Sequence, residues 1–257
     1  QVTKFIQTYV DAETEAQLLR EQGHSVIQYE RSNKEIGSDV SVVETPFRAL
    51  WARDTVRDIQ VLIDREQPDI LHVHNTWLLI SPAIYWAAYS RGVPVVQTLH
   101  NYRLLCPMAQ FLREGKPCEK CLGTTFPFPG VKHACYRNSW AQTALVGATI
   151  SAHKAIGTWA NKVDRYIALT EFAREKFKQG GIPEDRLVVK PNFVEDHGSG
   201  RTYGDFALFV GRVSEAKGID VALDAWSRTM CPKMPLKIVG AGEKSDEVMQ
   251  RARMMES

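Results

Sequence analysis

The stretch LFVGRVSEAKGIDVALDAW, residues 208–226, decides the fold class because it contains the pattern of a strand, a loop and a helix. An apolar run stops at Gly211, and apolar side chains resume after Gly218 at helical spacing. Arg212 and Lys217 lie in the loop between the two runs. The pattern predicts a β–α unit with two cations at the carboxyl end of its strand, where parallel α/β sheets bind their ligands.

The same alternation of short apolar runs and helical patterns extends along the chain. Strands are expected at residues 24–30, 69–74, 93–100, 164–170, 186–192, 206–210 and 236–239. Helices are expected at residues 10–22, 48–67, 82–92, 140–161, 171–181, 218–227 and 243–255. Strands that alternate with helices indicate βαβ units, so we expect an α/β fold with parallel sheets.

Composition divides the chain into two expected domains. Residues 1–194 form the first, with a cysteine-rich insertion at 101–138, and a polar, glycine-rich linker follows at 195–205. The βα pattern restarts at 206–257, which is too short for all the strands of a doubly wound sheet. The first expected element is a helix, whereas most α/β domains open with a strand. We therefore expect a chain that is truncated at both ends.

Charge and hydropathy exclude several classes of protein. The 257 residues are 44% hydrophobic with a formal net charge of +2, and basic residues are scattered among acidic ones. No nucleic-acid partner is expected, because such proteins concentrate their basic residues in a patch. The small-residue stretch 140–160 contains Gln142, His153 and Lys154, so we expect it to pack inside the protein rather than span a membrane. The first residues lack the apolar core of a secretory signal, which predicts a cytoplasmic location.

The loop cations and a second glycine-rich turn have the chemistry of a diphosphate site. Arg212 offers a bidentate fork and Lys217 a compact charge. Gly240 and Gly242 let the backbone approach an anion, and a helix that begins near Glu243 offers free N–H groups and the positive end of its dipole. Two alternatives to a diphosphate site stay open. Arg212 and Lys217 could be ordinary surface residues of a loop, and a single G-x-G turn is a weak signal of anion binding.

Several motifs together resemble one enzyme family. In chain order these are EQGHSV, DILHVHN, VPVVQTLHNYRLLCP, CEKCLG, ALTEFAREKF, VVKPNFVED, FVGRVSEAKGIDVALDAW and IVGAGE. This combination resembles the family-4 retaining glycosyltransferases over about residues 13–243. The resemblance implies a GT-B type fold, with a Rossmann-like parallel-sheet first domain and the start of a second Rossmann-like domain.

The resemblance implies a hexosyltransferase that uses a nucleotide-sugar donor, retains the anomeric configuration and acts in cell-envelope or polysaccharide synthesis. His100 would contact the transferred sugar, and His74 and Asn75 are candidate cleft residues. Arg212 and Lys217 would bind the donor diphosphate and stabilise the leaving nucleotide, without a catalytic metal. The implied donor-binding residues are Gly211, Arg212, Lys217, Gly240 and Gly242.

The chain departs from the family pattern at two places. No glycine precedes Gly23, so the family's glycine-rich first loop is absent, and no paired-glutamate motif follows Gly242 before the chain ends at Ser257. The donor site is therefore expected to be incomplete. We expect the 257-residue chain alone to have little or no transferase activity.

Four cysteines lie close together in the sequence and predict a structural zinc site. Cys118 and Cys121 have the spacing of a metal knuckle, and Cys106 and Cys135 flank them. Four thiolates leave no open position on zinc, so a catalytic zinc is not expected. Unligated thiols, disulfides and an iron–sulfur cluster stay open as alternatives, and His133 could replace one ligand.

The sequence leaves alternatives open for the identity of the acceptor and for the class of function. Arg103, Arg113 and Lys116 could meet an anionic or lipid-linked acceptor or a polysaccharide, with peripheral contact at the inner face of the membrane. Another GT-B enzyme, such as a nucleotide-sugar 2-epimerase or a phosphorylase, would show many of the same motifs. A non-catalytic, zinc-stapled binding or scaffold protein is the alternative from a different class.

Overall fold

The computed structural model describes residues 2–6, 10–31, 35, 44–193, 198, 204–228 and 234–255. It divides into two compact units, residues 1–194 and residues 195–257, and each unit is described separately. The expected linker at 195–205 lies outside the described residues except at positions 198, 204 and 205.

The first unit is built on a six-stranded, fully parallel sheet in the order β2-β1-β3-β4-β7-β8. Its strands are β1 Val2–Ile6, β2 Val26–Glu30, β3 Ile70–Val73, β4 Val95–Leu99, β7 Arg165–Ala168 and β8 Leu187–Val189. The direction of strand addition reverses between β1 and β3. Ligands of doubly wound sheets bind beside such a reversal, at the carboxyl ends of the strands.

Strand β1 corrects the expectation that the chain opens with a helix. Residues Val2–Ile6 form the second strand of the sheet, paired in parallel with both the edge strand β2 and β3. The VTKFI run has strand-forming residues, but five residues are too few to show a periodicity before the helical pattern begins.

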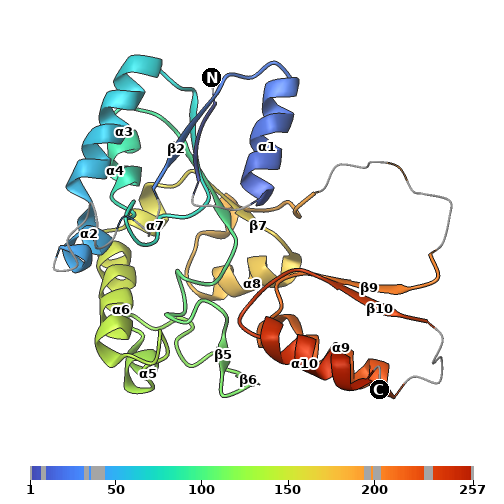
Figure 1. Cartoon of the computed structure of the whole chain (residues 1–257). Coiled ribbons are helices and arrows are strands. Elements are labelled where there is room, and N and C mark those ends of the chain that lie inside the picture. The colour runs from blue at the N-terminus through green and yellow to red at the C-terminus, as the bar shows by residue number, and fades with distance from the viewer. Residues whose placement is uncertain are drawn as a thin grey trace. The chain divides into compact units, whose positions relative to one another are not determined.

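Helices cover both faces of this sheet, with α1 on one side and α3 and α4 on the other (Figure 1). The helices are α1 Val10–Glu21, α2 Thr45–Trp51, α3 Arg53–Glu66, α4 Ile84–Tyr89, α5 Phe128–Lys132, α6 Trp140–Ala155, α7 Thr158–Asn161 and α8 Glu171–Gln179. Two expected long helices are each divided. Ala52 separates α2 from α3, and Gly157, with a left-handed φ of 74°, separates α6 from α7. The apolar spacing continues across both breaks, so the sequence pattern does not show them.

Helix α6 contains the small-residue stretch and packs inside the first unit. Its buried side includes Val146, Gly147 and Ile150. A Cβ added to Gly147 would lie 3.0 Å from Cγ of Pro127, so the glycine allows the residues before α5 to lie close against α6. Among the described residues, we find no helix whose length and apolar character would suffice to cross a membrane.

The second unit has a two-stranded parallel sheet with its own small core. Its elements are β9 Ala207–Val210, the 3-10 helix η3 Glu215–Lys217, α9 Ile219–Ser227, β10 Leu236–Val239 and α10 Ser245–Met255. The described buried apolar core of this unit consists of Val213, Ile219, Leu223 and Val248. Ion pairs fasten α9 to α10, with Arg251 of α10 lying 2.6 Å from Asp224 of α9.

Candidate functional site

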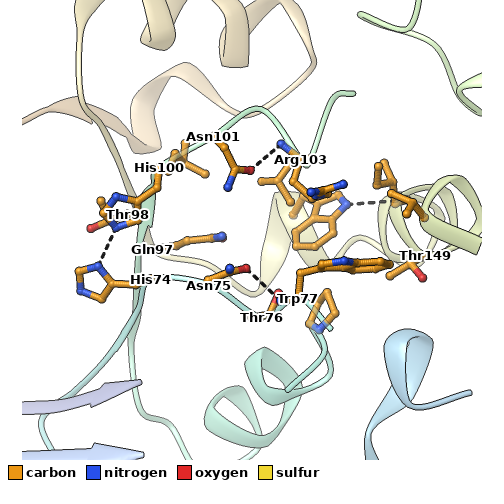
Figure 2. Close-up of a pocket in the computed structure, with 16 residues that line it drawn as sticks. His74, Asn75, Thr76, Trp77, Gln97, Thr98, His100, Asn101, Arg103 and Thr149 are labelled. Carbon is orange, nitrogen blue, oxygen red and sulfur yellow. Dashed lines mark hydrogen bonds between the residues drawn. The ribbon is translucent and has the colours of Figure 1, made fainter. Parts of the chain in front are cut away.

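Two histidines meet where neighbouring strands of the first unit end. His74 directly follows β3 and His100 directly follows β4, and these strands pair in parallel. Because their carboxyl ends lie at the same edge of the sheet, Nδ1 of His74 lies 2.8 Å from Nε2 of His100 (Figure 2). The histidine ring of His74 is buried, with 1% of its side chain exposed.

A carboxylate from α1 completes this polar line. The Glu15 carboxylate lies 3.8 Å from Nδ1 of His72 and 3.6 Å from Nε2 of His74. The ammonium of Lys190, which follows β8, lies 3.2 Å from the same carboxylate. A carboxylate is only an acceptor when ionised. Glu15 therefore favours a proton on Nε2 of His74, which leaves Nδ1 to accept the proton of Nε2 on His100.

The group of Glu15, His72 and His74 invites comparison with a metal site. It is the only set of three or more His, Cys, Asp or Glu ligand atoms within 4.8 Å of one another in the described part of the chain. Each histidine already uses its other ring nitrogen in a hydrogen bond inside the unit. Lys190 already supplies the cation beside the carboxylate. We therefore interpret the group as an ion-paired network.

A pocket of about 40 Å³ opens beside the histidine pair. The side chain of Gln97 points into it, as Figure 2 shows. The Gln97 oxygen is buried and has no hydrogen-bond partner among the described residues. The oxygens of Asn75 and Asn101, also at this pocket, fix the local backbone by accepting from the amides of Trp77 and Arg103 at 2.9 and 3.0 Å. The pocket thus carries an unused acceptor beside two oriented amides.

Arg103 forms part of the pocket wall and is held from within the unit. Its guanidinium lies over the rings of Trp77 and Tyr136, at 5.6 and 4.8 Å from their centroids. It also donates to the carbonyl of Pro107. Nε1 of Trp77 donates to the Tyr136 hydroxyl at 3.2 Å, so the wall is braced on two sides.

The two cations of the second unit lie in the loop after β9. Arg212 and Lys217 are both exposed, and neither side chain has an interaction partner among the described residues. Lys217 ends η3, and Gly218, with a left-handed φ of 72°, turns the chain into α9. Both charges are therefore available to a solvent-borne anion.

The glycines of the second unit bring its two loops together. A Cβ on Gly240 would collide with the carbonyl oxygen of Gly211, and a Cβ on Gly242 would collide with that of Val213. The amide of Gly211 donates to Val239 at 3.0 Å, and that of Val213 donates to Ala241 at 3.1 Å. Packing between loops thus explains these glycines, whatever else they bind.

The start of α10 differs from the expectation. The helix begins at Ser245 rather than near Glu243, and the Gly242 amide donates to the Ser245 hydroxyl at 2.9 Å. Asp246 and Glu247 occupy the first turn. Carboxylates at a helix N-terminus already interact with its positive dipole end, which weakens the case for an anion there. Arg212 and Lys217 remain the stronger anion-binding groups.

The structure brings the four expected metal-ligand cysteines to one cavity. Cys106, Cys118, Cys121 and Cys135 all line it, and so does Arg113, one of the cations considered for an acceptor. All four cysteines are free thiols. This cavity is separate from the pocket beside the histidine pair.

The structure also shows residues that the sequence analysis missed. Glu15 is one of several acidic residues on an amphipathic helix, and nothing in the sequence distinguishes it from the others. Gln97 did leave a signal, because it is a polar residue inside the apolar strand VVQTL. Trp77 and Tyr136 are 59 positions apart, so their contact follows from the fold alone.

Comparisons with known proteins come from sequence families and solved structures. The family model described as Glycosyltransferase Family 4 matches residues 12–197. No curated protein matches. A glycosyltransferase from Rickettsia africae ESF-5 is similar at 14% identity, with a TM-score of 0.57, over 99% of this chain and 64% of that chain.

Two other solved structures are similar over the whole of this chain. Anabaena Alr3699/HepE in complex with UDP has 13% identity and a TM-score of 0.53, with 66% of its own chain covered. The apo form of the lipopolysaccharide outer core galactosyltransferase WaaB has 13% identity and a TM-score of 0.50, with 65% covered. The chain therefore spans just under two thirds of the length of these proteins. The likeness shows an α/β fold of the GT-B type with Rossmann-like parallel sheets.

Proposed function

Because the chain belongs to Glycosyltransferase Family 4, we propose that it transfers a hexosyl group from a nucleotide-sugar donor to an acceptor with retention of configuration. The observation that carries this proposal is the His74–His100 pair, which lies at two strand ends beside a pocket with an unused amide acceptor. The same edge of a parallel sheet is where α/β enzymes place their ligands.

In this proposal Arg212 and Lys217 bind the donor diphosphate. Cleavage of a glycosyl–phosphate bond develops negative charge on the leaving diphosphate, and cations that are already in place lower that barrier. Both side chains are exposed and without a partner among the described residues, which supports this role. Side chains would then supply the charge, so we expect no requirement for a catalytic metal.

The pocket of the first unit would contact the transferred sugar. A sugar hydroxyl can donate to the Gln97 oxygen, which otherwise stays buried without a hydrogen bond. His100 would contact the sugar, and Asn75 is oriented to do so. Glu15 would act as a positioning residue, because it fixes the ring of His74 and through it the ring of His100. An acceptor from cell-envelope or polysaccharide synthesis, reached at the inner face of the membrane, completes the proposal.

The first test measures nucleotide binding by titration calorimetry of the whole chain. Nucleoside diphosphates should bind more tightly than monophosphates, with no change on adding EDTA. Arg212→Ala and Lys217→Ala should each weaken diphosphate binding by about 10- to 100-fold, since a hydrogen bond to a charged group contributes about 1.5–3 kcal/mol. Arg228→Ala, at an exposed arginine of the same unit, is the matched control. Equal losses in all three variants would contradict the assigned diphosphate site.

The second arm separates the sugar from the diphosphate. His100→Ala and Gln97→Leu should reduce binding of the matching nucleotide sugar while leaving that of the nucleoside diphosphate unchanged. Transfer of radiolabelled sugar to membrane or polysaccharide acceptors then reports the reaction itself. The same assay should be run on this chain and on any longer natural form of the protein. If all of them bind nucleotide sugars but none transfers sugar to an acceptor, the non-catalytic binding alternative would be favoured.

A further inference from the structure

Segment 101–138 folds around a small cavity lined by four thiols. Its short elements are the β5 Leu112–Arg113 and β6 Lys116–Pro117 hairpin and the five-residue helix α5. Cys106, the Cys118–Cys121 knuckle and Cys135 come from three separate parts of this segment and line one cavity of about 20 Å³. That volume suits a single water or a single ion.

Backbone contacts hold the walls of this cavity in place. The amide of Cys118 donates to the Phe111 carbonyl at 2.7 Å, and the amide of Cys135 donates to the Gly130 carbonyl at 3.1 Å. A Cβ on Gly130 would lie only 3.4 Å from the sulfur of Cys121. The position therefore fits glycine, and the cysteine backbones are placed independently of any ion.

Two cations line the same cavity, and one of them lacks an acceptor there. Nη1 of Arg113 is buried and has no hydrogen-bond partner among the described residues. Lys120 is the second cation. Neutral thiols are weak acceptors, whereas thiolates would accept charge-assisted hydrogen bonds. A zinc ion with four thiolates carries a net charge of −2, which these two cations would offset.

The segment contributes Leu105, Cys106 and Phe111 to the buried core of the first unit, but its β5–β6 hairpin contributes no side chain to that core. Its strands have two residues each, and large apolar side chains such as Phe128 and Leu112 are exposed. Small units of this kind commonly depend on a metal or on disulfides. All four cysteines are free thiols in this arrangement.

From these observations we propose that Cys106, Cys118, Cys121 and Cys135 bind one structural zinc ion. A Zn–S bond of about 2.3 Å places tetrahedral sulfurs about 3.8 Å apart. No three of these sulfurs lie within 4.8 Å of one another in the described structure, so the side chains must rotate toward the ion. Metal binding displaces the protons that free thiols hold.

The zinc centre would steady one wall of the histidine pocket. Cys106 lies shortly after His100, and the intervening turn is closed by the Cys106 amide, which donates to the Tyr102 carbonyl at 2.8 Å. Asn101 and Arg103, which line the pocket, belong to this turn. The inferred role is structural, because four thiolates leave zinc no open position.

The test begins with the full chain, purified under reducing conditions without chelators. Elemental analysis should find about one zinc per chain, and zinc-edge X-ray absorption should find sulfur ligands. A paired Cys118→Ser and Cys121→Ser variant should lose the zinc, whereas Cys231→Ser, at the one cysteine outside the segment, should keep it. Arg113→Met should retain the fold but release zinc to a competing chelator about tenfold more readily.

Four outcomes would overturn the zinc proposal, and a fifth would change its set of ligands. These are no zinc in the purified chain together with no uptake of added Zn²⁺, iron in place of zinc with visible absorption, disulfides detected by mass analysis of the non-reduced protein, or equal zinc loss in the Cys231→Ser control. The absorption measurement needs no variant, so failure of the double variant to fold leaves the test decisive. If X-ray absorption found three sulfur ligands and one nitrogen ligand, His133 would be identified as a ligand and the four-cysteine assignment would be overturned.

Discussion

At the scale of single residues, His153 shows how one buried ring joins distant parts of the first unit. Its Nε2 donates to the carbonyl of Leu50 at 2.8 Å, and its Nδ1 lies 2.9 Å from the hydroxyl of Thr158. That hydroxyl also accepts from Nε1 of Trp86 at 2.9 Å. These three hydrogen bonds are all satisfied when His153 is neutral and carries its proton on Nε2. Burial correspondingly lowers the pKa of His153 below its ordinary value of 6.5.

This ring predicts a pH dependence of stability. Below pH 6.5 the unfolded chain binds a proton that folded His153 resists, so the free energy of unfolding should fall as the pH drops from 7.5 to 5.5. His153→Gln should lower stability at pH 7.5 and show a smaller fall over the same range. Urea unfolding, followed by tryptophan fluorescence, measures both slopes. Identical slopes in the two proteins would assign the pH dependence to other groups.

At the scale of elements, the second unit depends on contact between its two loops. The β10 loop at Gly240 and Gly242 lies against the β9 loop at Gly211 and Val213 with no room for a side chain. The amide of Lys244 adds a further bond to the Val213 carbonyl at 3.2 Å. The loop that carries Arg212 therefore takes its shape from its neighbour.

Substitution at the contact should destabilise the second unit. Gly240→Ala should lower its unfolding free energy by roughly 2 kcal/mol or more, because the new Cβ meets backbone and φ is 142°. Gly218→Ala is the matched control, since it has a left-handed φ of 72° but open space, and it should cost only about 1 kcal/mol. Hydrogen exchange of β9 and β10 measures the difference. Equal effects would show that backbone conformation, not the loop contact, sets the cost.

The helices and strands also show how much of the fold the sequence pattern predicts. Strand β4 and helix α8, capped by the Thr170 hydroxyl, occur where the apolar pattern and the capping residue predict them. The breaks at Ala52 and Gly157 were not predicted, because the apolar spacing runs through both. His74 and His100 could each be placed at a strand end from the pattern alone, but their contact follows from the pairing of β3 with β4. Glu15 could not, because only the fold brings α1 beside β3.

At the scale of the whole molecule, the two units differ in the size of their described cores. The first buries a cluster that includes Tyr85, Tyr166 and Phe177 around six strands, whereas the second buries four apolar residues beside two strands. Two-stranded sheets are marginally stable unless a helix or further strands cover them. Unequal stability of the two units is the consequence.

We therefore expect two unfolding transitions instead of one. Amides of β9 and β10 should exchange faster than those of β3 and β4, and the second unit should unfold at lower urea concentration. Trp226 is the one tryptophan of the second unit in the sequence, so its fluorescence reports the unfolding of that unit. The signal of Trp226 is obtained by subtracting the fluorescence of a Trp226→Phe variant. A single transition, coincident for all probes, would show that the units unfold as one.

The contact between Lys190 and Glu15 connects the backbone segment that follows β8 to the histidines at the strand ends. Lys190 lies just after the last strand of the sheet, and its ammonium partly neutralises the carboxylate that faces two imidazoles. The Glu15 carboxylate is thus shared between this ammonium and the rings of His72 and His74. The course of the backbone after β8 therefore decides whether Glu15 keeps its cation or faces the two rings alone.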